Sequence, residues 1–248
     1  MNRCLLFVTP LILLAVSVAM ADRYISGVVW PEPPVITPGE NNGPPSDAIV
    51  LFDGKNLDAW KNPGNKTTVD ADGAFTVKNA LETKQSFGDC QLHVEFAEPN
   101  PPKGRDQGRG NNGIGLMGAR YEIQVLDSYE NKTYFEGQCA SVYNQKPPMV
   151  NASRKPGEWQ TYDIAFTAPR FDADGKVAKP AFVTVFHNGV LVQNHTEIQG
   201  NTFYDQPPKY TKHPDKQPLV LMYHGDPVRF RNIWVRELKE LVPTGGKK

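Results

Sequence analysis

The chain has 248 residues, of which 39% are hydrophobic and 10% aromatic, so it can build one sizeable core. Lysine plus arginine and aspartate plus glutamate balance at 27 each, which removes the electrostatic reason to expect nucleic acid or an anionic membrane as a partner. The 22 prolines and 21 glycines favour many short strands joined by turns.

The first 21 residues have the features of a signal peptide. Arg3 precedes an apolar run over 5–18, and Ala19-Met20-Ala21 is a small-x-small cleavage site. The run is too short for a membrane anchor and contains Pro10. We therefore expect an exported protein, periplasmic or extracellular, without stable membrane insertion after cleavage.

Cleavage would remove Cys4 and leave two cysteines, Cys90 and Cys139. In an oxidising compartment they could form a disulfide, or they could be two buried small hydrophobic residues. Because the sequence does not place their Cα atoms, both alternatives stay open.

Residues 22–47 are expected to form an extended arm or linker, because six prolines between residues 31 and 45 forbid a helix and disfavour a central strand. The folded domain is then expected over 48–241. The remaining residues, 242–248, are predicted to be a disordered tail.

Within the domain the dominant hydrophobic period is two, which is typical of strands. It predicts strands over 91–96, 121–125, 159–166, 181–186, 219–223 and 228–235. Asn188-Gly189 predicts a two-residue hairpin turn. No long segment has the helical period, and strand follows strand, so an all-β fold is expected and a parallel α/β sheet is not.

Three long loops, 97–110, 128–148 and 200–217, separate the strands. Long loops in a compact domain are often functional. Their aromatic residues could cover a site or could simply fasten the loops to the sheets; they are Tyr134, Phe135, Tyr143, Phe203, Tyr204 and Tyr210.

Alternation along 121–125 places Ile123 and Val125 in the core and Glu122 and Gln124 on the opposite face, with Asp127 at the strand end. A carboxylate and an amide on one face suit the hydroxyl groups of a sugar. The competing interpretation is a solvated outer surface.

His224 follows another predicted strand and precedes a Gly-Asp-Pro turn. A histidine there could be a general base, a metal ligand or a structural residue bonded to backbone. Asn111-Asn112-Gly113 could present amides to a ligand or could be a turn that opens the next strand.

Several familiar catalytic motifs are absent from the sequence: HExxH, paired CxxC, GxSxG, phosphate loops and dinucleotide fingerprints. A two-carboxylate glycosidase is also disfavoured. Glu122 and Asp127 are five residues apart on an extended chain, beyond the roughly 5–10 Å that such a pair needs.

A set of motifs that occur in order resembles the 3-keto-disaccharide hydrolase domain family, also described as 3-keto-glucoside-1,2-lyase/3-keto-2-hydroxyglucal hydratase. The resemblance spans roughly 46–241. The motifs are LFDGKNLDAW at 51–60, Thr83-Lys84, GNNG at 110–113, YEIQVLDS at 121–128, GEWQTYDIAF at 157–166, VTVFHNGVLVQNH at 183–195 and VRFRNIWVREL at 228–238.

The resemblance implies a concanavalin A-like jelly-roll sandwich of two antiparallel sheets, and an exported enzyme that cleaves 3-keto-glycosides, by hydrolysis or by elimination followed by hydration. The alternative function is a non-catalytic, lectin-like carbohydrate-binding module. Members commonly have Gln-Asp-His-Gly where this chain has Met222-Tyr223-His224-Gly225. This departure favours the alternative.

For the enzyme, motif position and strand facing suggest His224 as the base and Glu122 as its partner. The same two residues are candidate ligands of one divalent metal ion. Candidate binders of the carbohydrate are Lys84, Asn111, Gln124, Asp127, Tyr143 and Arg231.

Overall fold

The computed structural model describes residues 26–61 and 67–246. The predicted signal peptide and Cys4 lie outside the described residues. The chain divides into two compact units, one made of its two ends, up to Pro33 and from Leu241, and one spanning Pro34–Glu240. In the first unit, β1 (Val28–Val29) pairs antiparallel with β16 (Gly245–Gly246). Strand β16 lies within 242–248, the segment predicted to be a disordered tail.

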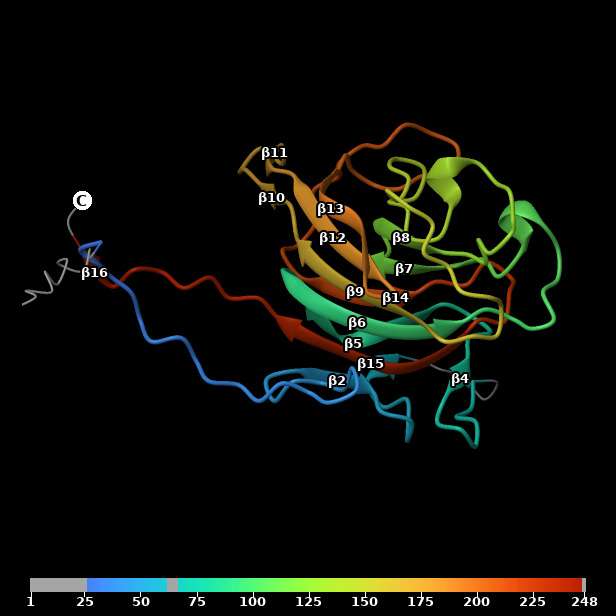
Figure 1. Cartoon of the computed structure of the whole chain (residues 1–248). Coiled ribbons are helices and arrows are strands. Elements are labelled where there is room, and N and C mark those ends of the chain that lie inside the picture. The colour runs from blue at the N-terminus through green and yellow to red at the C-terminus, as the bar shows by residue number, and fades with distance from the viewer. Residues whose placement is uncertain (1–25, 62–66, 247–248) are drawn as a thin grey trace, which may run out of the picture. The chain divides into compact units, whose positions relative to one another are not determined.

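The unit Pro34–Glu240 contains two large antiparallel sheets (Figure 1), which confirms the predicted jelly-roll sandwich. The seven-stranded sheet has the order β13-β12-β9-β6-β15-β2, with β4 also paired to β15. Its strands are β2 (Ile49–Phe52), β4 (Phe75–Thr76), β6 (Cys90–Ala97), β9 (Gln160–Thr167), β12 (Ala181–His187), β13 (Val190–Ile198) and β15 (Arg229–Glu237).

The five-stranded sheet has the order β3-β5-β14-β7-β8. Its strands are β3 (Trp60–Lys61), β5 (Leu81–Phe87), β7 (Asn112–Leu116), β8 (Tyr121–Val125) and β14 (Gln217–Leu221). A separate hairpin joins β10 (Arg170–Phe171) to β11 (Val177–Lys179).

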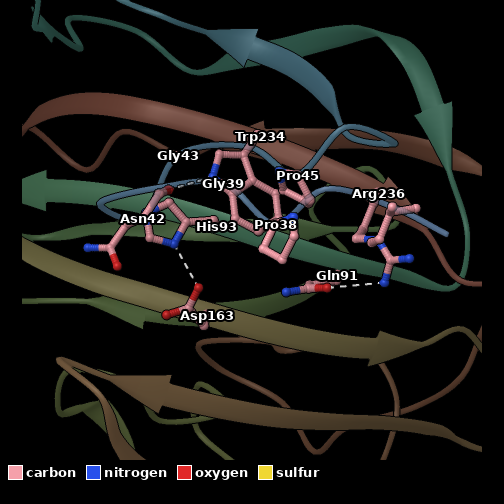
Figure 2. A pocket seen from close by; sticks show the side chains of 11 residues that line it. Pro38, Gly39, Asn42, Gly43, Pro45, Gln91, His93, Asp163, Trp234 and Arg236 are labelled. Atoms are coloured by element: carbon pink, nitrogen blue, oxygen red, sulfur yellow. Dashed lines mark hydrogen bonds and ion pairs between the residues drawn. The ribbon is translucent and has the colours of Figure 1, made fainter.

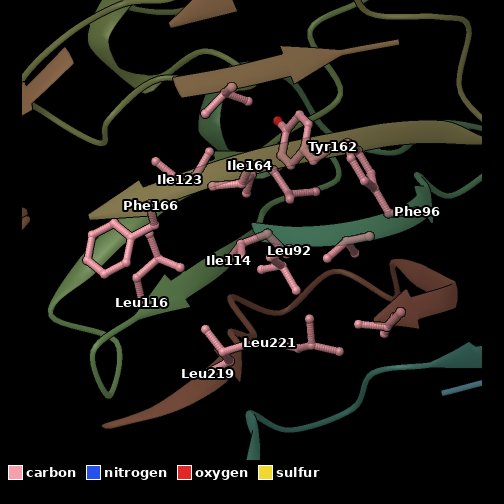
Figure 3. Packing of buried hydrophobic residues seen from close by; sticks show 14 of the residues in the cluster. Leu92, Phe96, Ile114, Leu116, Ile123, Tyr162, Ile164, Phe166, Leu219 and Leu221 are labelled. Carbon is pink, nitrogen blue, oxygen red and sulfur yellow. The ribbon is translucent and has the colours of Figure 1, made fainter. Parts of the chain in front are cut away.

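Alternating apolar residues from both sheets fill the space between them (Figure 3). On β9, Tyr162, Ile164 and Phe166 are at most 1% exposed and point toward the other sheet. Leu92 and Phe96 of β6 face the same core. The opposing layer includes Ile114, Leu116, Ile123, Leu219 and Leu221. Burial of each such side chain contributes about 1.5–3 kcal/mol, so the period-two pattern is what joins the two sheets.

The Asn188-Gly189 turn between β12 and β13 has φ values of +53° and +78°, as a two-residue hairpin requires. The predicted strand over 219–223 is wrong at its end, because β14 stops at Leu221. The next residue, Met222, still donates its backbone N–H to the Gly113 carbonyl oxygen at 2.8 Å. The chain then turns away, which brings His224 to the end of the sheet.

Strands β6, β7 and β8 are buried on both faces. The outer face of β6 includes His93, 1% exposed, and the Pro-rich segment 36–45 crosses this region of the sheet (Figure 2). Both Trp234 Nε1 and Asn232 Nδ2 donate to the Asn42 carbonyl oxygen, at 2.9 and 3.0 Å. The segment is therefore fastened to the seven-stranded sheet. The outer face of β8 is covered by loops, which form the site described below.

Cys90 and Cys139 are buried, free thiols, which matches the interpretation of two small buried residues. Burial raises the pKa of each thiol to about 12. Within 26–61 and 67–246, no helix has the length and apolar character needed to cross a membrane.

Candidate active site

The site is built on the outer face of the five-stranded sheet, where β7 has no side chain at Gly113. Glu122 on β8 fills that gap. A Cβ atom placed on Gly113 would lie 2.2 Å from Glu122 Oε1. The carboxylate thus lies across β7 toward the end of β14, where its Oε1 is 3.4 Å from His224 Nε2.

The Glu122 carboxylate is 5% exposed and the His224 ring 38% exposed. The hydrogen bond that His224 donates to the Glu122 carboxylate raises the pKa of His224 above its ordinary value, against the opposing effect of burial. When the Nε2 proton points at Glu122, the lone pair is on Nδ1. The pair therefore offers a partly exposed imidazole ring whose Nε2 faces a buried carboxylate, an arrangement suited to a general base.

Amides form one wall of the pocket beside this pair. Gln124 Nε2 lies 3.0 Å from Gln107 Oε1 and 3.4 Å from Asn111 Oδ1. With the Gln124 amide in the opposite orientation, its nitrogen donates instead to Glu122 Oε1 at 3.0 Å. Asn111 is held in turn, because its Nδ2 donates to the Gln107 carbonyl oxygen at 2.8 Å.

The other wall comes from two loops that complete the open edge of β8. Tyr143 donates its backbone N–H to the Glu122 carbonyl oxygen, and Glu122 donates its own to Thr202 Oγ1 (3.1 and 3.0 Å). Asn144 Nδ2 bonds the carbonyl oxygens of Phe203 and Tyr204. These bonds fix the loops to each other and place Tyr143 and Tyr204 at the pocket.

The pocket has a volume of about 320 Å³, at the small end of the ~300–1,000 Å³ typical of ligand sites. It brings together five residues predicted from sequence: Asn111, Glu122, Gln124, Tyr143 and His224.

The other three predicted binders lie elsewhere. Asp127 forms an ion pair with Arg109 (Oδ2 to Nε, 2.6 Å) and borders a neighbouring cavity. Lys84 is exposed on β5, which β14 and β7 separate from β8, and does not line the pocket. Arg231 belongs to the seven-stranded sheet, where it bonds Glu95 at 2.6 Å and lies 4.1 Å from the Trp159 ring centroid.

Four further residues line the pocket that were not chosen as site residues from the sequence: Gln107, Thr202, Tyr204 and Met222. Three of them lie in the long loops, so no strand periodicity could orient them. The sequence feature that could have indicated the loop residues was their aromatic content, for which two roles were open: covering a site or fastening the loops to the sheets. The structure has an example of each role. Tyr204 lines the pocket, whereas Tyr210 fastens its loop by accepting the Ala181 N–H at 2.8 Å.

Glu122 and His224 are also the two predicted metal ligands. In the described part of the chain, no three His, Cys, Asp or Glu side chains gather as a metal cluster. Two such donors are fewer than the three or four that proteins usually supply to a transition metal. The pair alone does not make a closed metal site, and the reaction below is therefore derived from the protein's own groups.

A jelly-roll sandwich with an amide-lined pocket beside a carboxylate–imidazole pair is an arrangement suited to polyhydroxylated ligands. Residues 47–236 match the family described as the 3-keto-alpha-glucoside-1,2-lyase-like domain. The match covers most of the chain, and the protein belongs to this family. No curated protein sequence matches the chain significantly.

Solved structures agree with this assignment. A candidate glycosyl hydrolase from Parabacteroides distasonis is 48% identical, with a TM-score of 0.81, over 86% of this chain and 95% of its own. A second candidate glycosyl hydrolase from that organism is 22% identical, with a TM-score of 0.55, over 77% of this chain and 99% of its own. The second similarity is evidence of a shared fold only.

Proposed function

We propose that the protein is an exported carbohydrate-active enzyme that cleaves 3-keto-glycosides by elimination followed by hydration. The observation that carries the proposal is the 3.4 Å approach of His224 Nε2 to the Glu122 carboxylate inside an amide-lined pocket. Family membership supports the substrate class.

The 3-keto group makes the hydrogen at C2 of the sugar acidic. His224, through its Nδ1 lone pair, takes that proton, and the C2–H electrons form an enolate between C2 and C3. The buried Glu122 carboxylate stabilises the imidazolium that results. One N–H of Asn111 Nδ2 bonds the Gln107 carbonyl oxygen, and the other is assigned to the enolate oxygen.

The enolate then collapses. Its electrons form the C1–C2 double bond, and the C1–O bond breaks. The leaving oxygen takes a proton, for which the imidazolium of His224 is the nearby donor. Water then adds across C1–C2, with hydroxyl at C1 and hydrogen at C2, to give the free 3-keto sugar. One residue pair serves both halves, since His224 is neutral again after it protonates the leaving oxygen. It can then take a proton from the water that attacks C1 and deliver that proton to C2.

The test is a turnover assay with 3-keto-glucosides, measuring aglycone release by the purified protein and by His224→Ala and Glu122→Gln. We expect release by the parent protein and loss in both variants. If both variants retain near-parental turnover, the assigned roles are wrong. Repeating the assay with a chelator tests the divalent ion, which stays a prediction.

A non-catalytic carbohydrate-binding module is the second candidate, favoured by Met222, which lines the pocket where the family resemblance implies a glutamine. It predicts that 3-keto-glucosides raise the melting temperature of the protein without release of aglycone. In that case Glu122→Gln would weaken binding only modestly.

A further inference from the structure

We infer that Tyr204 forms a subsite for an aromatic leaving group, so that aryl glycosides are preferred substrates. This inference rests on the proposed function for its chemistry. Its physical basis is an exposed aromatic ring and several amides in the lining of one pocket. The amides belong to Gln107, Asn111 and Gln124, and the ring belongs to Tyr204.

Tyr204 is 80% exposed although it lines the pocket, so its ring stands at the mouth. An aromatic side chain so exposed is usually on a flexible segment, but this loop is fastened on both sides of the ring. Thr202 Oγ1 accepts the Glu122 N–H at 3.0 Å, and the Tyr204 carbonyl oxygen accepts from Asn144 Nδ2 at 3.3 Å. The backbone that carries the ring is thus held beside the pocket.

The hydroxyl-rich sugar ring requires hydrogen-bond partners, and the amide wall beside the Glu122–His224 pair supplies them. The pocket of about 320 Å³ opens to solvent beside Tyr204, which lines it and is 80% exposed. The group attached at C1 is assigned to this mouth. There it meets the Tyr204 ring, whose π-face suits stacking with an aromatic aglycone.

Binding can be measured without turnover by using unoxidised ligands, which lack the 3-keto group. The probes are 4-nitrophenyl α-glucoside and methyl α-glucoside, with dissociation constants from calorimetry or ligand-observed NMR. We expect the aryl glucoside to bind about 3- to 10-fold more tightly, the range that one aromatic contact supplies. Tyr204→Ala should remove this preference, because it weakens binding of the aryl glucoside more than binding of methyl glucoside.

Phe186→Ala is the matched control, because Phe186 is an exposed aromatic, 41%, on β12 of the other sheet. It should keep the preference. Equal binding of the two ligands by the parent protein, or an equal loss for both in Tyr204→Ala, overturns the subsite.

The turnover arm separates this inference from the proposed function. With 3-keto aryl and 3-keto methyl glucosides, Tyr204→Ala should raise KM for the aryl substrate about 3- to 10-fold more than for the methyl substrate. If neither substrate is cleaved by the parent protein while the binding preference is present, the proposed function fails and the subsite stands. If the parent protein cleaves both substrates without any aryl preference in binding or KM, the subsite fails and the proposed function stands.

Discussion

The smallest feature on which the candidate site depends is the missing side chain at Gly113. The φ of this residue is not in the left-handed region, so an alanine is compatible with its backbone. Its Cβ would nevertheless lie 2.2 Å from Glu122 Oε1. The carboxylate would have to move away from His224. Because Gly113 has no side chain, the Glu122 carboxylate can lie over β7 and reach His224.

We predict that Gly113→Ala lowers kcat by about 100-fold, the usual effect of a displacement of about 1 Å at a catalytic group. Gly108→Ala is the control, because Gly108 has no heavy atom within 4 Å of its added Cβ. Both variants should keep the parental circular dichroism spectrum. Equal activity in the two variants would show that the Glu122 position is not critical.

The ionisation of His224 gives a second prediction at this scale. Its pKa is raised by the hydrogen bond to Glu122, and the base must be neutral to accept a proton. The kcat/KM value should therefore rise with pH through an apparent pKa above the usual 6.5 of histidine. In Glu122→Gln the pKa of His224 should fall, since the carboxylate is gone and burial still disfavours the cation.

The measurement is an NMR titration of the His224 ring in the parent protein and in Glu122→Gln, together with pH–rate profiles where activity remains. An unchanged titration midpoint in the variant would contradict the pairing. The titration needs no substrate, so it tests the geometry separately from the reaction.

Sequence reasoning found the site residues that strand geometry constrains and missed others. Glu122 and Gln124 follow from alternation on one strand, and His224 from its place at a strand end. Thr202 and Gln107 lie in loops, whose paths depend on long-range hydrogen bonds. Arg231 alternates correctly on its strand, but the sequence does not say which sheet that strand joins.

At the level of elements, strands with clear alternation were predicted and those without it were not. β7 reads NGIGL, in which two glycines remove the outward-facing side chains that would show the pattern. Gly113 is what allows Glu122 to cross the strand, whereas a side chain at Gly115 would meet Ala119 and Val220. The alternation that would predict β7 is therefore weak, because the site requires a glycine at one of its outward-facing positions.

The Pro-rich segment 36–45 is an element without regular structure that is held by side chains of β15. We predict that Trp234→Phe loosens it, because the change removes the Nε1 donor to Asn42 and keeps the aromatic ring stacked on His93. The free energy of unfolding should fall by about 1 kcal/mol, a typical value for one hydrogen bond.

Hydrogen exchange followed by mass spectrometry should show faster exchange in peptides covering 36–45 and little change in β9. Trp60→Phe is the control, since Trp60 Nε1 donates to Leu51 at 2.9 Å, outside the segment. It should lower stability without a selective effect on 36–45. Identical exchange patterns in the two variants would mean that the Trp234 bond does not hold the segment.

For the whole molecule, one buried acid makes stability depend on pH. Glu98 is 2% exposed, its Oε2 accepts from Gln160 Nε2 at 2.6 Å, and its Oε1 has no partner. Burial raises the pKa of Glu98 from 4.5 to about 8, so the folded protein keeps this carboxyl protonated at neutral pH. The unfolded chain ionises it from its ordinary pKa upward.

This difference in pKa between the folded and unfolded states sets the direction in which stability changes with pH. The contribution of Glu98 is fully present below about pH 4.5 and is lost as the pH rises toward 8, because the unfolded state releases the proton first. By pH 7 the loss is of order 3 kcal/mol. Glu98→Gln keeps an acceptor for Gln160 and has no proton to release. We therefore predict that it flattens the fall in stability between pH 5 and pH 8.

The measurement is urea denaturation of the parent protein and the variant at several pH values across that range. Glu82→Gln, on the exposed face of β5, is the control and should retain the parental slope. At pH 8 Glu98→Gln should be more stable than the parent, whereas near pH 5 the two should be nearly equal. A parental slope in Glu98→Gln would mean that the carboxyl ionises within the fold, with a water or a displaced Arg109 as its partner.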